Sequence, residues 1–99
     1  MKNLFITTTL DHYLKSKNAF TIVDQIIELQ KNPQVFNEDF QVWKITKIDE
    51  ITFSIELQDG NLNTILLHYF QSASIKIFEL TVWLENSTLY FPMSINTIN

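Results

Sequence analysis

Two histidines are the side chains best suited to proton transfer in this sequence, because an unperturbed imidazole titrates close to neutral pH. His68 lies between Leu66 and Phe70 in an alternating stretch, so it would face a core and either find a hydrogen-bond partner there or line a pocket. A core histidine satisfied by a tyrosine or a backbone group is the more common of these outcomes. His12 follows Asp11, but sequence neighbours point apart on a helix or a strand, so this doublet has no catalytic geometry.

Other kinds of catalytic chemistry lack the residues or the spacing that they need. The absence of Cys excludes disulfides and thiolate zinc sites. Neither histidine has the helical spacing to a second His or a Glu that holds a metal. The serines and threonines have no glycine elbow and no neighbouring base. We therefore expect no enzymatic activity, no catalytic residue, no metal and no cofactor.

The charge balance argues against nucleic acid as a partner. Seven Lys and Arg against eleven Asp and Glu give a net charge of −4, and the basic residues are scattered. Binding to a phosphate backbone by counterion release needs clustered basic residues. A modestly acidic surface favours solubility and, more weakly, attraction to a basic protein.

The apolar segments are too short for a membrane protein. No window approaches the roughly 18 apolar residues of a spanning helix. Residues 1–10 carry one Lys and an apolar run broken by three Thr, which is too short and too polar for a secretory signal. We expect a cytoplasmic protein with no membrane partner, and the bias toward Ile, Asn, Phe and Lys suggests a bacterial or phage source.

The length and composition predict a single domain over residues 1–99, built from regular elements with short connections. A chain of this size can bury enough surface to fold without a staple. One Gly and two Pro leave little room for long irregular loops.

The clearest local pattern is the perfect alternation of apolar and polar residues over residues 51–58, which predicts a strand with one buried face. Its inner face would carry Ile51, Phe53, Ile55 and Leu57. The pattern keeps a period of two from Phe40 onward, and it predicts strands over residues 40–48, 51–58, 63–71, 75–84 and 89–95. Breaks of two to four residues favour antiparallel hairpins, so we expect a meander.

The amino-terminal third is predicted to supply the main helix. Residues 18–31 place their apolar side chains on one half of a helix, with Asn18 as N-cap and Asn32-Pro33 as the stop. Residues 4–10 would form a first strand, or Thr9 would cap a helical turn over residues 10–15, and we favour a short strand followed by a helical turn. Residues 32–39 would form the longest loop, in which Phe36 either tucks back over the helix or contributes to a functional site.

These elements predict an α+β fold in which one main amphipathic helix packs on a five- to six-stranded antiparallel meander sheet. The order strand, helix, then five strands is similar to that of cystatin-like inhibitors and, more loosely, to the cone-shaped fold of ketosteroid isomerase. The resemblance implies a curved sheet around the helix. No inhibitory glycine segment, Pro-Trp loop or isomerase acid and tyrosine set is found, so no functional residue carries over.

The most informative surface is the outer face of the predicted sheet, because its apolar residues cluster instead of scattering. Phe78 would share the inner face, whereas the outer face would gather a set of partner-binding candidates, to which Phe36 is added from the loop: Ile65, Leu67, Tyr69, Ile75, Ile77, Trp83 and Tyr90. The cover of this face could be residues 4–14, a second copy or another protein, or closure of the sheet into a barrel.

The leading functional hypothesis is a small, soluble, acidic protein-binding module, such as an inhibitor or an immunity-type partner of another bacterial or phage protein. Tyr and Trp among aliphatic side chains are typical of such interfaces. The alternatives are a cone-shaped domain with a small-ligand or enzymatic pocket near His68, and a structural subunit that forms homo-oligomers such as dimers.

Overall fold

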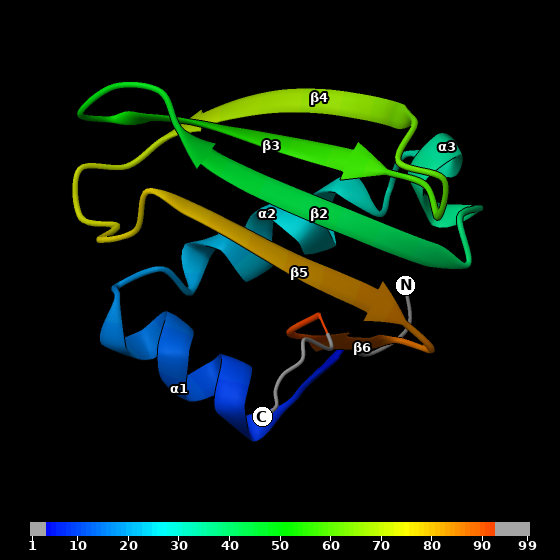
Figure 1. Ribbon diagram of the computed structural model, residues 1–99, viewed down its shortest axis with the longest axis horizontal. Helices are drawn as coiled ribbons and strands as arrows, with labels where there is room; N and C mark the ends of the chain where they lie inside the picture. The colour runs from blue at the N-terminus through cyan, green and yellow to red at the C-terminus, as the bar shows by residue number, and fades with distance from the viewer. Residues whose placement is uncertain (1–3, 93–99) are drawn as a thin grey trace.

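A computed structural model of the chain describes residues 4–92, and it shows an α+β fold with three short helices and a six-stranded mixed sheet (Figure 1). The elements are β1 (Phe5–Ile6), α1 (Thr8–Ser16), α2 (Thr21–Leu29), α3 (Pro33–Phe36), β2 (Phe40–Lys47), β3 (Thr52–Gln58), β4 (Thr64–Gln71), β5 (Glu79–Glu85) and β6 (Thr88–Tyr90). The predicted α+β class is confirmed, whereas the main helix predicted over residues 18–31 is shortened to α2 and is accompanied by α1 and α3.

The strands follow the order β1-β6-β5-β2-β3-β4, so the predicted meander is wrong. β2, β3 and β4 form consecutive antiparallel pairs, as the sequence pattern predicts. β5 then pairs with β2 and not with β4, and β6 follows β5 by a hairpin. β1 pairs with β6 in parallel, which makes the sheet mixed.

The departure from a meander is caused by residues 72–78, which cross from β4 to the far side of β2. This segment carries Ile75 and Ile77 into the core, where only 4% and 5% of their surfaces are exposed. Backbone bonds hold it on both sides, since Lys76 N donates to Lys17 O and Lys47 N donates to Phe78 O. The predicted strand over residues 75–84 therefore begins only at Glu79.

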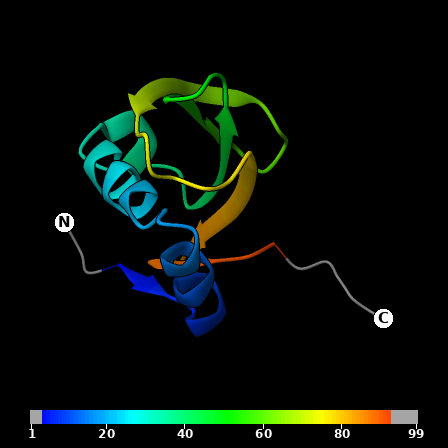
Figure 2. The ribbon, with the colours of Figure 1, turned by 90° about the vertical axis from the view of Figure 1, so that its left-hand side faces the viewer.

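The core lies between the inner face of the sheet and the helices. Figure 1 shows α2 running behind β2 and β3, and Figure 2 shows the sheet curving around that side. The alternation of β3 is confirmed, because Phe53, Ile55 and Leu57 are fully buried, and Trp43 and Ile45 of β2 join them. Ile51 and Phe78, which the pattern places on this inner face, are exposed because each precedes a strand. The end of the strand predicted over residues 89–95 lies outside the described residues.

The joint between α1 and α2 explains why the helix predicted over residues 18–31 begins only at Thr21. Asn18 has a positive φ of 53° and terminates α1 in place of capping α2. Ala19 N donates to Leu14 O at 2.8 Å and Asn18 N donates to Lys15 O at 3.3 Å, which is the Schellman pattern. Leu14 and Ala19 are both buried, which adds the hydrophobic contact typical of this motif.

The predicted loop over residues 32–39 contains α3. Asn32 does not only stop the preceding helix: its Oδ1 accepts from Gln34 N at 2.9 Å, and Pro33 occupies the first turn of α3. Asparagine at the N-cap followed by proline is a favoured helix start. This turn buries Val35 and leaves Phe36 55% exposed.

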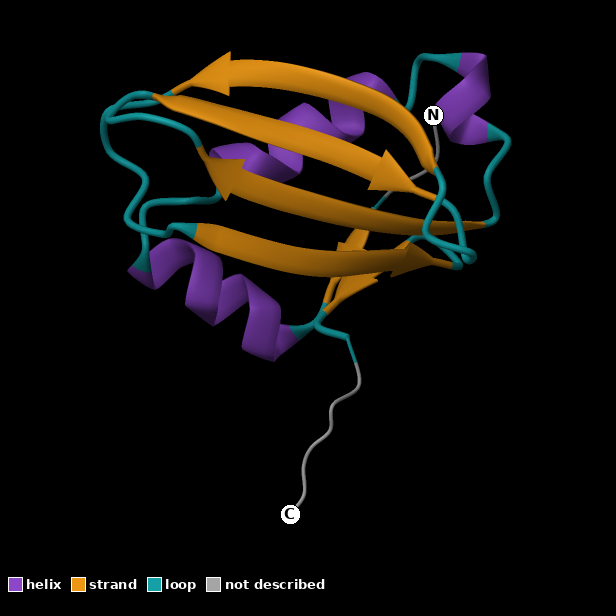
Figure 3. Ribbon diagram, turned by 45° about the horizontal axis from the view of Figure 1, so that its top comes forward, coloured by secondary structure: helices purple, strands orange, loops and turns teal. Residues whose placement is uncertain are grey.

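Residues 4–14 do not cover the outer face of the sheet. β1 extends the sheet beside β6, with Phe5 N donating to Ser87 O at 2.7 Å, and α1 sends Leu10 and Leu14 into the core. Figure 3 shows the strands β2 to β5 in front with no helix over them. That face of the described strands is therefore open.

Candidate functional site

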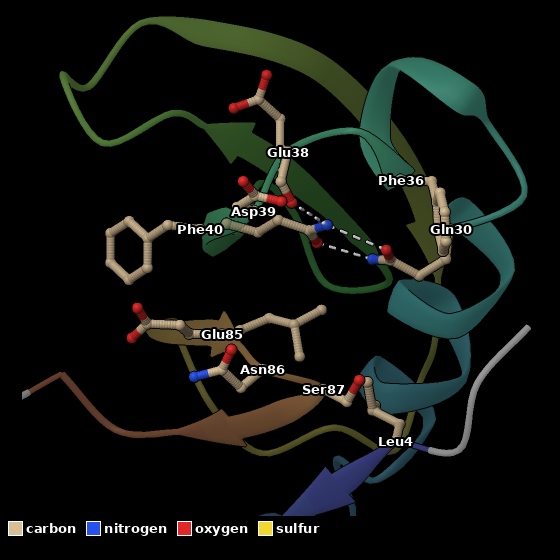
Figure 4. Close-up of a pocket in the computed structure, with 11 residues that line it drawn as sticks. Leu4, Gln30, Phe36, Glu38, Asp39, Phe40, Glu85, Asn86 and Ser87 are labelled. Carbon is tan, nitrogen blue, oxygen red and sulfur yellow. Dashed lines mark hydrogen bonds between the residues drawn. The ribbon is translucent and has the colours of Figure 1, made fainter.

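A cleft of about 390 Å³ opens where the start of β2 meets the turn between β5 and β6 (Figure 4). The end of α2 and the exposed ring of Phe36 close it on one side. Its lining combines amides, carboxylates and apolar side chains: Leu4, Gln30, Phe36, Glu38, Asp39, Phe40, Gln41, Leu84, Glu85, Asn86 and Ser87.

One wall of the cleft is made by the β5–β6 turn. Asn86 and Ser87 have positive φ values of 52° and 62°. Two successive residues in this region form the tight hairpin turn that suits the twist of antiparallel strands. Ser87 O also accepts from Phe5 N, so the turn is held to β1.

The opposite wall is built on a pair of buried glutamines. Gln30 and Gln41 are 7% and 3% exposed, and their side-chain amides bond reciprocally at 2.8 and 3.0 Å. Gln41 Nε2 also lies 3.0 Å from Val35 O and 3.2 Å from Glu38 O, and its two hydrogens are shared among these carbonyls and Gln30 Oε1. These bonds tie the end of α2 and the segment after α2 to the first inward-facing residue of β2.

Trp43 fixes the direction in which this amide pair points. Its indole Nε1, which can only donate, bonds to Gln41 Oε1 at 2.9 Å. The atom of the Gln41 amide that faces Trp43 must therefore be the oxygen. The Nε2 group must then face the carbonyls of Val35 and Glu38. The orientation of the Gln30 amide at the cleft wall follows, because its Nε2 must donate to Gln41 Oε1 and its Oε1 must accept from Gln41 Nε2.

The charge of the cleft is of one sign. Glu38, Asp39 and Glu85 line it, and none of its eleven lining residues is basic. Lys31 is near by, in a second hollow on the other side of Phe36, but its ammonium pairs with Glu28 at 3.0 Å. The cleft therefore favours cations over anions.

Glu85 connects the cleft to an aromatic cluster on the outer face of β2, β5 and β6. Phe40 and Trp83 meet edge to face at 5.2 Å, and Trp83 and Tyr90 do so at 5.9 Å. Tyr90 Oη donates to Glu85 Oε1 at 3.0 Å. Burial, together with this bond and the charge of Glu85, raises the pKa of Tyr90 above its ordinary value.

The structure divides the predicted partner-binding residues into separate places. Phe36 lines the cleft, while Trp83 and Tyr90 are partly exposed in the adjoining aromatic cluster. Ile65, Leu67 and Tyr69 lie on β4, and β2 and β3 separate them from Trp83. The predicted continuous patch is therefore wrong, because it depended on β5 lying next to β4.

Ile75 and Ile77 are not available to a partner, because both are buried in the core. The prediction places them on the outer face by counting residues back along one straight strand. The backbone is not a strand there, so the count does not apply.

The predicted pocket near His68 is also corrected. His68 pairs with Ile55 in the β3–β4 register, as expected for the inner face, but β4 is the last strand of the sheet and the imidazole is exposed. His68 does not line the cleft.

Phe36 is the one cleft residue that sequence reasoning selected; it missed the others, among them Gln30, Gln41, Asp39 and Glu85. One signal was present for Gln41, which shares the inner parity of β2 with Trp43 and Ile45 and is polar at a position where an apolar residue is expected. Nothing in the sequence places Gln30 opposite it.

Within residues 4–92, no group of three or more metal-ligating side chains is close enough to hold a metal ion. The helices of this described range are also too short and too polar to cross a membrane.

A family model, described as a family of unknown function (DUF6876), matches residues 1–95. The chain belongs to this family. The match covers nearly all of the sequence, so the fold and the cleft both fall inside the family region. Neither the curated proteins nor the solved structures contain a match to the chain.

Proposed function

We propose that this DUF6876 protein is a small protein-binding module that takes up a basic side chain of a partner in the cleft beside Gln30 and Phe36. The observation that carries the proposal is an open cleft of about 390 Å³ that is lined by three carboxylates and no basic residue. An inhibitor or an immunity-type protein directed at a basic partner belongs to this class.

The lining suits the two parts of an arginine or lysine side chain. Leu4, Leu84 and the exposed ring of Phe36 offer apolar contacts to the aliphatic stem. Asp39 and Glu85 offer carboxylates to the charged end, and arginine can bind a carboxylate through two parallel hydrogen bonds. The volume is in the lower part of the range for binding sites, which fits one long side chain.

The surroundings support a protein partner. The net charge of −4 attracts a basic surface from a distance. The aromatic cluster of Phe40, Trp83 and Tyr90 adjoins the cleft and carries the residue types that interfaces favour. A partner whose basic side chain entered the cleft would cover this cluster as well.

The proposal can be tested by NMR with an alanine-based peptide that carries one arginine, against the same peptide with neutral citrulline. We expect the arginine peptide to shift the side-chain amide signals of Gln30 and Asn86, and the indole N–H of Trp43 through Gln41. The citrulline peptide should shift them far less, because the charge provides most of the attraction.

Variants locate the binding. Asp39→Asn combined with Glu85→Gln should weaken arginine-peptide binding by about tenfold, as expected for loss of two charge-assisted contacts. Glu50→Gln removes an exposed carboxylate outside the cleft and should have little effect. Equal responses to the two peptides, or shifts away from the cleft, would contradict the proposal.

A further inference from the structure

β4 is an edge of the sheet, and its register with β3 is regular from Leu66 to Gln71, beyond an irregularity at Ile65. It is the last strand in the order β1-β6-β5-β2-β3-β4, and within residues 4–92 no strand pairs with its other side. Figures 1 and 3 show β4 as the outermost strand, with α3 close only to its beginning. An unpaired edge is a template on which another strand can add.

The sequence of β4 contains none of the residues that keep other strands away. Its eight residues, Thr-Ile-Leu-Leu-His-Tyr-Phe-Gln, include no Lys, Arg, Asp, Glu or Pro. Natural edges usually carry such residues to prevent pairing. Leu67 and Tyr69 are instead 52% and 55% exposed.

The hydrogen-bond pattern identifies which backbone groups are free. Ser72 N donates to Ile51 O at 2.8 Å, and Gln71 lies opposite Thr52 in the register. Backbone groups in an antiparallel pair alternate between the two sides of the strand. The amides of residues 66, 68 and 70 therefore face β3, and those of Leu67, Tyr69 and Gln71 point outward.

We propose that β4 pairs with β4 of a second copy, antiparallel across a two-fold axis at His68, to join two sheets into one. This pairing places Leu67 of one copy opposite Tyr69 of the other on the outer face, twice by symmetry. Aromatic and aliphatic side chains directly opposite each other stabilise such pairs. The outward amides of Leu67 and Tyr69 then bond to the facing strand.

The symmetric register favours a second copy as the occupant, because Leu67 and Tyr69 of one strand meet Tyr69 and Leu67 of the other. Each copy has a net charge of −4, so most of its surface repels another copy. The uncharged β4 edge is a place where two copies meet without like charges on the paired strands. Glu56, which lies opposite Leu67 on β3, is bonded to Thr64 Oγ1 and Gln58 Nε2 within its own copy. The surface is separate from the acidic cleft, so a dimer leaves the cleft open.

The test combines sedimentation equilibrium with amide hydrogen exchange on the full chain. We expect a concentration-dependent dimer, and we expect the amides of Leu67, Tyr69 and Gln71 to gain protection as it forms. The amides of residues 66, 68 and 70 should be protected at every concentration, because they bond to β3.

Two matched variants identify the surface. Leu67→Lys should weaken dimerisation by about tenfold or more while the fold persists, since the introduced ammonium can pair with Glu56 across the strands. Ile48→Lys makes the same charge change at a side chain that is 54% exposed but lies outside β4, and it should leave the dimer unchanged. A chain that remains monomeric at about 1 mM, or a dimer in which the three outward amides gain no protection, would overturn the proposal. The monomeric result would assign the edge to an extended segment of another protein.

Discussion

Gln41 is the residue on which the cleft wall depends. Its amide accepts a hydrogen bond from Trp43, exchanges bonds with Gln30 and donates to two backbone carbonyls. Gln30 takes part only in the two bonds that it exchanges with Gln41. The two glutamines are equally polar and similarly buried, but they differ in how many groups would lose their partner if they were removed.

Gln41→Leu should therefore destabilise the fold by about 2–4 kcal/mol, because it leaves the Trp43 indole, the Gln30 amide and the Glu38 carbonyl without these partners, whereas Val35 O still accepts from Glu38 N. Gln30→Leu should cost about 1 kcal/mol, since Gln41 keeps its other bonds. Urea unfolding of both variants measures the difference. Equal losses would mean that the network does not have Gln41 at its centre.

At the scale of the element, short polar residues place the helix boundaries. Asn18 ends α1 and Asn32 begins α3, although the sequence interpretation makes Asn18 a start and Asn32 a stop. Asparagine suits both roles, because its side chain caps helix starts and its backbone tolerates positive φ. The local sequence therefore predicts that a helix boundary lies at each asparagine, but not whether a helix begins or ends there. At Asn18 this depends on how Leu14 and Ala19 pack.

Asn18→Ala should destabilise the protein by about 1 kcal/mol, because alanine resists the left-handed conformation that Asn18 adopts. Asn18→Gly is the matched control, and it should change the free energy of unfolding by only a few tenths of a kcal/mol. Thermal unfolding of the two variants checks this. A loss for glycine as large as that for alanine would mean that the left-handed conformation is not what favours asparagine at this position.

For the whole molecule, the alternating pattern predicts well where strands lie in the sequence, but it predicts poorly which strands pair with each other. Period two over residues 51–58 fixes which side chains of β3 are buried, because that is a local property of the backbone. The choice of β2 over β4 as partner of β5 depends on where Ile75 and Ile77 can be buried. That choice also moves Trp83 away from Tyr69 and leaves β4 at an edge, so the site predictions failed together.

Ile77 and Phe78 allow a direct test of this topology, since the sequence interpretation places Phe78 inside and Ile77 outside. Ile77→Asp should destabilise the protein by about 4 kcal/mol or more, because it buries an unpaired carboxylate. Phe78→Asp should cost within about 1 kcal/mol, since its ring is 79% exposed. Chemical denaturation of both variants measures this order, and the reverse order would favour the meander.

The parallel pairing of β1 with β6 has a consequence for the time at which the sheet is completed. Phe5 lies opposite Thr88, so β1, the first described strand, can dock only after β6, the last one, is in place. During synthesis, β2, β3 and β4 can pair as soon as they emerge, whereas β1 and α1 remain without their sheet partner. Closing so long a loop costs chain entropy and slows folding. The β5–β6 hairpin is thus the step that brings the amino-terminal segment into the fold, and the cleft, whose wall includes Leu4 and Ser87, is completed only then.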